Sequence, residues 1–224
     1  MIEIFIQTFF LYFIVIDPLG NTPLFLSITQ HMETKQKIKV ALSATIIASI
    51  ILLFFALLGS SLLSYLHISY PAFTIGGGII LLIIAIEMLF DKRQQRKGED
   101  IDLNSDNVSI FPLATPIIAG PAAITSVIVS VSDIGTNFTN QTVGMFSLVI
   151  VSVSDIGTNF TNQTVGMFSL VIVLSITFII FFIASKFSKI INKKIISVIS
   201  RVVAIILVGL SVQYILDGIN NFLN

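Results

Sequence analysis

The sequence contains no cysteine and no tryptophan, and only 11% of its 224 residues are charged. Without cysteine, the chain has no disulfide framework, no thiolate metal ligand and no thiol nucleophile. Its formal net charge is zero, so the basic patch that nucleic-acid binding requires is not indicated. The two histidines, His31 and His67, fall in short polar connections, and we interpret them as solvated loop residues rather than metal ligands. No HExxH, G-x-S-x-G or P-loop pattern occurs, so we expect no enzymatic activity, no metal site and no cofactor.

Apolar residues are in excess: 55% of the chain is hydrophobic, and the mean hydropathy is +1.00. A soluble domain of this length cannot bury so much apolar surface. Six stretches reach the roughly 20 apolar residues that a bilayer-spanning helix needs. Because lipid offers the backbone no hydrogen-bond partner, we predict an all-α polytopic membrane protein with six transmembrane helices. The predicted spans are 4–30, 40–64, 71–90, 108–131, 165–185 and 195–216.

The basic residues predict the orientation of these spans. Lysine and arginine cluster after the first, third and fifth spans, and the other connections and both ends of the chain contain neither. The start of the chain has no basic n-region and no small-residue cleavage site, so the first apolar stretch is expected to remain as a span. Positively charged loops stay on the cytoplasmic side. We therefore expect both termini to face outward, with the lipid bilayer as the surroundings of the spans.

Residues 127–148 are repeated letter for letter as residues 149–170. We interpret this tandem duplication as a recent in-frame event or a sequence artefact, and the alternative is an added gating or recognition loop. The repeat creates an apolar piece, Val143–Val153, about half as long as a span needs. We predict that it does not cross the membrane and that the outer loop runs from Ser132 to Thr164.

Two motifs in the first and fourth spans match each other. The first span contains DPLGNTP at 17–23, and the fourth contains TPIIAGP at 115–121, with two prolines five residues apart in each. Three spans per half is an odd number, so a second half built on the same pattern enters the membrane from the opposite side. We predict two inverted three-helix repeats, 1–90 and 108–224, joined by a charged cytoplasmic loop at 91–107.

Proline and glycine should break both spans near the middle of the bilayer. A break exposes amides at the start of one half-helix and carbonyls at the end of the other, which favour an anion and a cation respectively. A zwitterion such as an amino acid satisfies both. We expect the broken spans to meet at the centre, with the third span packed tightly through Gly76, Gly77 and Gly78. The candidate substrate-binding residues are Asp17, Gly20, Asn21, Thr22, Thr115, Ala119 and Gly120, and the helix-breaking residues are Pro18, Pro23, Pro116 and Pro121.

Several of these residues also have structural interpretations. Asp17 is expected to carry a proton or bind a substrate ammonium, because a carboxylate in mid-membrane is costly. However, Asp followed by Pro is also a strong signature of a helix N-cap. Asn21 and Thr22 are equally suited to binding substrate and to bonding the broken backbone of their own span. We interpret Glu87 as a solvated residue at the cytoplasmic end of the third span, with a proton site as the alternative.

The motifs DPLGNTPLFL and TPIIAGPAAIT resemble those of the MarC family of bacterial membrane proteins, and the resemblance covers nearly the whole chain. The resemblance implies an inner-membrane protein of inverted three-helix repeats. It also implies transport of small neutral amino acids such as glycine and alanine, coupled to protons. The duplicated block departs from the family pattern.

The sequence thus predicts a secondary transporter or exporter of small neutral amino acids or similar solutes that works by alternating access. Two alternatives stay open: a channel-like facilitator of a small solute, and a membrane protein of the envelope without a transport role.

Overall fold

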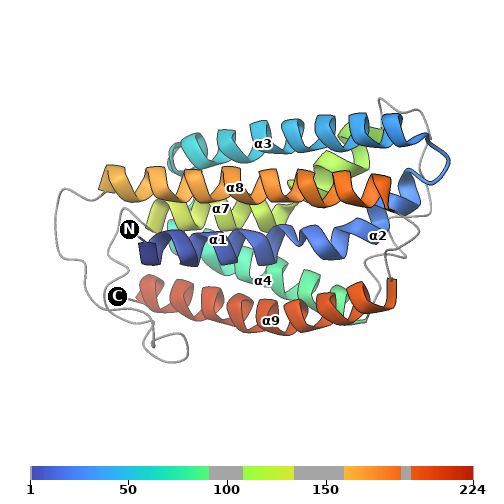
Figure 1. Ribbon diagram of the computed structural model, residues 1–224. Helices are drawn as coiled ribbons and strands as arrows, with labels where there is room; N and C mark the ends of the chain where they lie inside the picture. The colour runs from blue at the N-terminus through green and yellow to red at the C-terminus, as the bar shows by residue number, and fades with distance from the viewer. Residues whose placement is uncertain (1, 91–107, 134–158, 188–192, 224) are drawn as a thin grey trace.

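The computed structural model describes residues 2–90, 108–133, 159–187 and 193–223, and all regular structure in these residues is helical (Figure 1). The predicted all-α class is confirmed. The predicted loop at 91–107 and the apolar piece at 143–153 lie outside the described residues. The elements are α1 (Ile2–Ile16), α2 (Pro18–Ile28), α3 (Thr34–Tyr65), α4 (Tyr70–Leu89), the distorted helical segment η1 (Ser109–Ile118), α7 (Pro121–Asp133), α8 (Asn159–Lys186) and α9 (Lys193–Leu223).

Five spans are each long and apolar enough to cross a bilayer: Ile2–Ile28, Thr34–Tyr65, Tyr70–Leu89, Thr164–Lys186 and Ile195–Leu223. The first of them consists of α1 followed by α2. A sixth span is obtained when the bent pair η1 and α7 is counted as one. Each of the six coincides with one of the predicted stretches, and each has the length and apolar composition that a bilayer-spanning helix needs.

Local sequence signals set where two of the helices begin. At the start of α3, the Gln36 side chain accepts a hydrogen bond from the Glu33 amide at 3.1 Å, which satisfies a donor that the helix leaves unpaired. At the start of α4, Ser69 Oγ accepts from the Ala72 amide at 3.4 Å, and Pro71 occupies the first turn.

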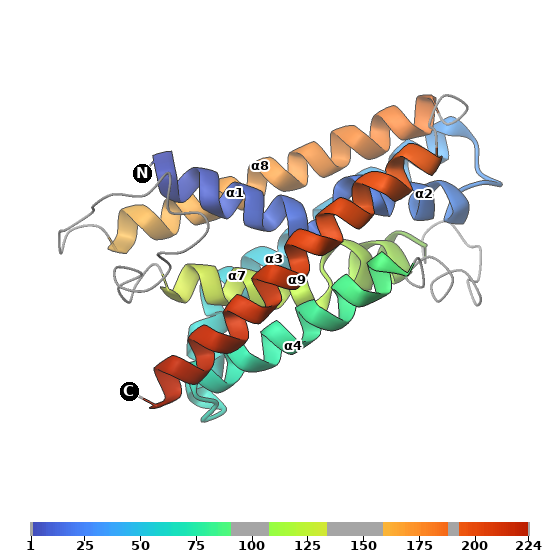
Figure 2. The same ribbon diagram turned by 90° about the horizontal axis from the view of Figure 1, so that it is seen from below.

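The chain runs back and forth along one direction, and both termini lie at the same end of the helix bundle (Figures 1 and 2). The start of α3, with Lys35, Lys37 and Lys39, lies at the opposite end, as does the end of α8 with Lys186. This arrangement agrees with the alternation of basic connections along the sequence. The side of the membrane that each end faces stays a prediction.

The outer surface of the bundle is apolar. Ile50 on α3 and Ile205 on α9 are each more than 60% exposed. Several hydroxyl groups inside the bundle donate to the backbone one turn earlier in their own helix, as Thr45 does to the Ala41 carbonyl and Thr177 to the Val173 carbonyl. Such a surface suits hydrocarbon, where an unsatisfied polar group is costly.

The third and sixth spans, α4 and α9, form the most extensive helix pair. Glycines allow this approach: a Cβ added to Gly78 would lie 2.7 Å from the Ser211 carbonyl oxygen, and one added to Gly218 would lie 2.9 Å from the Pro71 carbonyl oxygen. Gly77 instead lies against Thr125 of α7, and Gly76 has open space beside it. Two of the three glycines predicted to permit tight packing therefore do so.

The helix contacts are matched between the two halves. The first span (α1, α2) packs on α8, as the fourth span (η1, α7) packs on α3. Contacts also join α4 with α9, α3 with α8, and α1 with α7. Inverted repeats predict these pairings: exchanging the halves interchanges the first two pairings and leaves each of the other three unchanged. The repeat itself stays a prediction.

The connection between the fourth and fifth spans is shorter than predicted. The sequence predicts a loop from Ser132 to Thr164, but α7 continues to Asp133 and α8 already begins at Asn159. Residues 127–133 of the first copy thus end α7, and residues 159–170 of the second copy begin α8. The prediction counted only apolar residues, whereas a helix can continue past the apolar span into polar sequence.

Candidate functional site

The first span is interrupted at a single residue, Asp17, between α1 and α2. Its φ of 49° and ψ of 63° are left-handed, a conformation that Asp and Asn adopt more readily than other residues with a Cβ. Asp17 Oδ1 accepts a hydrogen bond from the Gly20 amide at 3.0 Å, so the side chain caps α2 in front of Pro18. The capping interpretation of Asp17 is therefore confirmed, and its role in transport stays a prediction.

Gly20 allows a helix of the other half to approach this cap. A Cβ at this position would overlap the Asp17 carboxylate and lie 2.6 Å from Ser200 Oγ on α9. Ser200 is buried, and its hydroxyl has no hydrogen-bond partner among the described residues. Sequence reasoning missed Ser200, because a serine near the start of an apolar span carries no signal until the fold brings α9 against α2.

Asn21 connects the two broken spans. Its Nδ2 donates to the Ile16 carbonyl at 2.7 Å, across the break in its own span, and to the Ile117 carbonyl of the fourth span at 3.5 Å. Thr22 Oγ1 donates to the Pro18 carbonyl at 2.8 Å. Both side chains therefore bond the broken backbone, which was one of the two roles predicted for them.

The break in the fourth span is larger than the one in the first. Phe111, Thr115 and Pro116 have non-helical dihedral angles, and η1 and α7 meet at an angle of 52°. The sequence placed this break at Pro116–Pro121, whereas the distortion already begins at Phe111, before Pro112. A residue before proline is disfavoured in the helical region, and this effect repeats at Thr115. The part of the span before the bend, η1, is therefore not the regular half-helix that was predicted.

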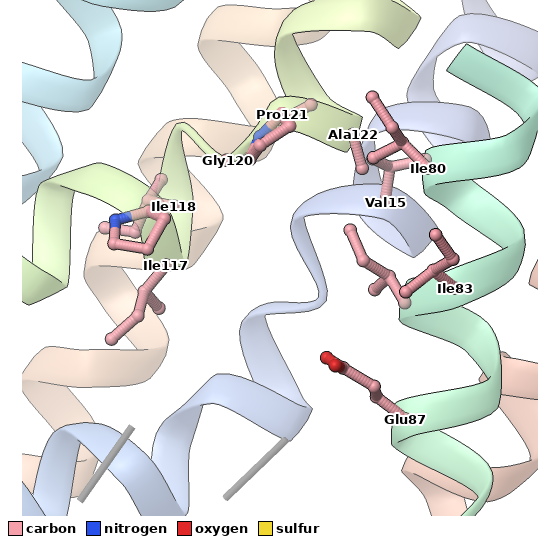
Figure 3. A pocket seen from close by; sticks show the side chains of 12 residues that line it. Val15, Ile80, Ile83, Glu87, Ile117, Ile118, Gly120, Pro121 and Ala122 are labelled. Carbon is pink, nitrogen blue, oxygen red and sulfur yellow. The ribbon is translucent and has the colours of Figure 1, made fainter. Parts of the chain in front are cut away.

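A cavity of about 240 Å³ lies beside this bend, between α1, α4 and the fourth span (Figure 3). Most of its wall is apolar, and its single ionisable lining residue is Glu87. The lining residues are Val15, Ile80, Ile83, Ile84, Glu87, Pro116, Ile117, Ile118, Gly120, Pro121, Ala122 and Ala123.

Glu87 lines the cavity from α4, two residues before the end of that helix, and its side chain is half-exposed. Its interpretation as a solvated residue and the alternative of a proton site both stay predictions. Figure 3 shows its carboxylate pointing away from the α4 backbone, towards the chain that leaves α1. Its distance from the span end in the sequence did not show which face of α4 it occupies.

The structure brings only part of the predicted site to the cavity. Gly120, Pro116 and Pro121 line it, whereas Asn21 is not a lining residue and only donates to the carbonyl of Ile117, which is one. Thr115 and Ala119 adjoin lining residues without belonging to the wall. Asp17, Gly20 and Thr22 belong to the cap and the first turns of α2, and none of them lines the cavity.

The cavity differs in its polar groups from a metal centre. No group of three or more His, Cys, Asp or Glu side chains that could hold a metal occurs in the described ranges. The cavity instead combines one carboxylate with the amino-terminal end of α7, where backbone amides of the first turn have no partner within the helix. A carboxylate and a helix start attract charges of opposite sign.

Comparison with known proteins extends this description. The family profile described as "MarC family integral membrane protein" matches residues 2–223. The chain belongs to the MarC family. The resemblance predicted from the two motifs is thereby confirmed, together with the membrane-spanning character of the protein.

Several curated relatives of this MarC chain carry membrane-protein names. A "UPF0056 membrane protein" of Aquifex aeolicus is 28% identical and aligns over 98% of this chain and 94% of its own length. Another of Methanocaldococcus jannaschii is 37% identical over 61% of this chain and 70% of its own length. One of Buchnera aphidicola is 27% identical over 95% of this chain. No solved structure matches the MarC chain.

Proposed function

We propose that this protein is a secondary transporter of small neutral amino acids or similar zwitterionic solutes, coupled to protons and working by alternating access. We place it in the inner membrane of a bacterium, with both termini on the periplasmic side, because the basic connections follow the first, third and fifth spans.

The observation that carries this proposal is the contact between the two broken spans. Asn21 donates to the Ile16 carbonyl at the first break and to the Ile117 carbonyl at the second. Irregular backbone at membrane depth is stable only where protein or a water-filled cavity surrounds it, and transporters use such breaks as binding sites. A continuous bundle of six helices without this role would have no need of two matched interruptions.

The size of the cavity supports a small substrate. Its volume of about 240 Å³ lies below the roughly 300–1,000 Å³ of pockets for drug-sized ligands. Its apolar wall leaves room for a short aliphatic side chain, and Glu87 and the start of α7 supply one charge of each sign.

Reconstitution tests the proposal directly. Purified protein in liposomes should take up radiolabelled L-alanine with saturable kinetics, and the rate should depend on an imposed pH gradient. For the acidic substitutions described below, Glu3→Gln serves as the control, because Glu3 lies at the start of the first span, away from both breaks. Flux that rises linearly with concentration would indicate the channel-like alternative. The absence of flux for a panel of amino acids would indicate a membrane protein without a transport role.

A further inference from the structure

Two tyrosines tie the walls of the cavity together at the end of the bundle that holds both termini. The Tyr12 hydroxyl of α1 is hydrogen-bonded to the Ser130 hydroxyl of α7. The Tyr70 hydroxyl of α4 donates to the carbonyl of Val129, the neighbouring residue of α7, at 3.1 Å. The cavity lies between these same three elements, α1, α4 and the fourth span. Tyr12 is only 1% exposed, so its ring fills the interior of the bundle rather than facing lipid.

These contacts lie on the terminus side of the cavity. Tyr12 precedes the lining residue Val15 by three residues, and Ser130 follows the lining residue Ala123 by seven. At 1.5 Å per helical residue, these steps are about 4.5 Å and about 10 Å towards the termini. The lining residues of α4 begin at Ile80, in the half of that helix that leads away from the termini (Figure 2). The two tyrosine contacts therefore stand between the cavity and the terminus end of the bundle.

The two broken spans meet closely at one end only. Their terminus halves, α1 and α7, pack against each other, whereas the opposite halves, α2 and η1, touch far less. Asn21 of α2 donates to the Ile117 carbonyl of η1 at 3.5 Å, which is longer than an ordinary hydrogen bond. Exchanging the halves of an inverted repeat turns an α1–α7 contact into an η1–α2 contact. One joint is thus closed and its counterpart is loose, which is the asymmetry that alternating access requires.

Hydroxyl contacts suit a joint that opens and closes. When the partners separate, water offers each of them an equivalent hydrogen bond, so the net loss of free energy is small. Other buried hydroxyls of the bundle donate to their own helix, as Thr177 does to the Val173 carbonyl. The hydroxyls of Tyr12 and Tyr70 instead reach a second helix, so they respond to its position.

We propose that Tyr12 and Tyr70 are gating residues that close the cavity at the terminus end. Transport then requires both hydrogen bonds to α7 to break, while α2 and η1 close on the opposite side. This proposal rests on the proposed transport function and adds to it the residues that control access from one side. In the orientation proposed above, this gate is the periplasmic one.

Thr8 provides a matched control one turn away on α1. Its hydroxyl donates to Ser169 Oγ of α8 at 2.8 Å, and both residues are buried. Helix α8 packs along α1 and α2 alike, so this bond joins elements that stay together when α1 separates from α7. Removing the Thr8 hydroxyl therefore deletes a buried bond between helices without acting on the gate.

Labelling of a single cysteine from each side of the membrane tests the gate. The chain has no cysteine, so Ala123→Cys places one thiol in the cavity wall. A charged methanethiosulfonate that cannot cross the bilayer should label this thiol faster from the side opposite the termini. In this background, Tyr12→Phe should raise the labelling rate from the terminus side roughly fivefold, because one buried hydrogen bond no longer favours the closed state. Thr8→Val should leave that rate unchanged.

Ser130→Ala and Tyr70→Phe test the same gate independently. Ser130→Ala removes the other partner of the Tyr12 bond, so it should raise the rate as Tyr12→Phe does, and the two changes combined should add nothing further. Tyr70→Phe removes the second bond, so its combination with Tyr12→Phe should raise the rate further. Unchanged rates in Tyr12→Phe and Ser130→Ala, or an equal increase in Thr8→Val, would overturn the gate.

The labelling assay needs no transport, so the two proposals fail in different ways. Saturable uptake of L-alanine by the wild-type protein, with unaltered labelling in the gate variants, would overturn the gate and leave the transport function standing. The absence of saturable uptake by the wild-type protein would overturn the transport function and, with it, the role of the gate in transport.

Discussion

Replacing Asp17 separates its structural role from its role in transport. The side chain caps α2 through the Gly20 amide, and the backbone is left-handed with a φ of 49°. Asparagine retains an oxygen that can accept the same hydrogen bond, and it tolerates the same backbone conformation. Asp17→Asn therefore removes the charge and the exchangeable proton while keeping the cap. Asp17→Ala removes all of these features.

The structure allows the two effects to be estimated. Loss of the cap costs about 1 kcal/mol, and the several-fold preference of Asp over Ala for the left-handed region adds up to about 1 kcal/mol, so Asp17→Ala should lower the free energy of unfolding by about 1–2 kcal/mol. Asp17→Asn should remain as stable as the wild type or become more stable. Asp17 is only 4% exposed, and a neutral amide is less costly to bury than a carboxylate.

Thermal unfolding in detergent measures the first effect, and uptake of labelled L-alanine at several external pH values measures the second. We expect Asp17→Asn to insert and unfold like the wild type but to lose the dependence of uptake on the pH gradient. Wild-type uptake by Asp17→Asn at every pH, at normal membrane levels, would refute the coupling role and leave Asp17 as a helix cap only. A stability loss in Asp17→Asn as large as that in Asp17→Ala would refute the capping argument.

Two further predictions concern packing and the duplication. Gly78→Ala should lower stability by about 1–3 kcal/mol, because its Cβ would lie 2.7 Å from a backbone oxygen of α9. Gly76→Ala, with open space beside it, should be neutral or stabilising in the same thermal assay, and equal losses in the two variants would contradict this reasoning. Deletion of residues 149–170 gives the same polypeptide as deletion of 127–148 and leaves three residues between α7 and α8. We expect this shorter chain to insert and to transport L-alanine like the wild type, and a stably inserted but inactive deletion protein would show that the duplication has a function.

The membrane-spanning architecture was predictable because its signal is local. Each span is a run of apolar residues long enough for the bilayer, and neither neighbouring helices nor loops alter that requirement. The Asp-Pro signature also sufficed for the N-cap at Asp17, since a cap involves only residues three apart. The predicted ends of the loop between the fourth and fifth spans were wrong. Helical hydrogen bonding continues through polar residues, and a count of apolar residues excludes these.

The sequence by itself determined the six spans, the two interruptions and the acid that caps the first of them, since each depends on residues adjacent in the chain. Only the tertiary structure decided which groups share a space. It brought Ser200 against Gly20, joined Asn21 to the backbone of the fourth span, and turned Glu87 towards a cavity beside Gly120. These neighbours are between 33 and 180 residues apart in the sequence, and only the packing of the helices brings them together.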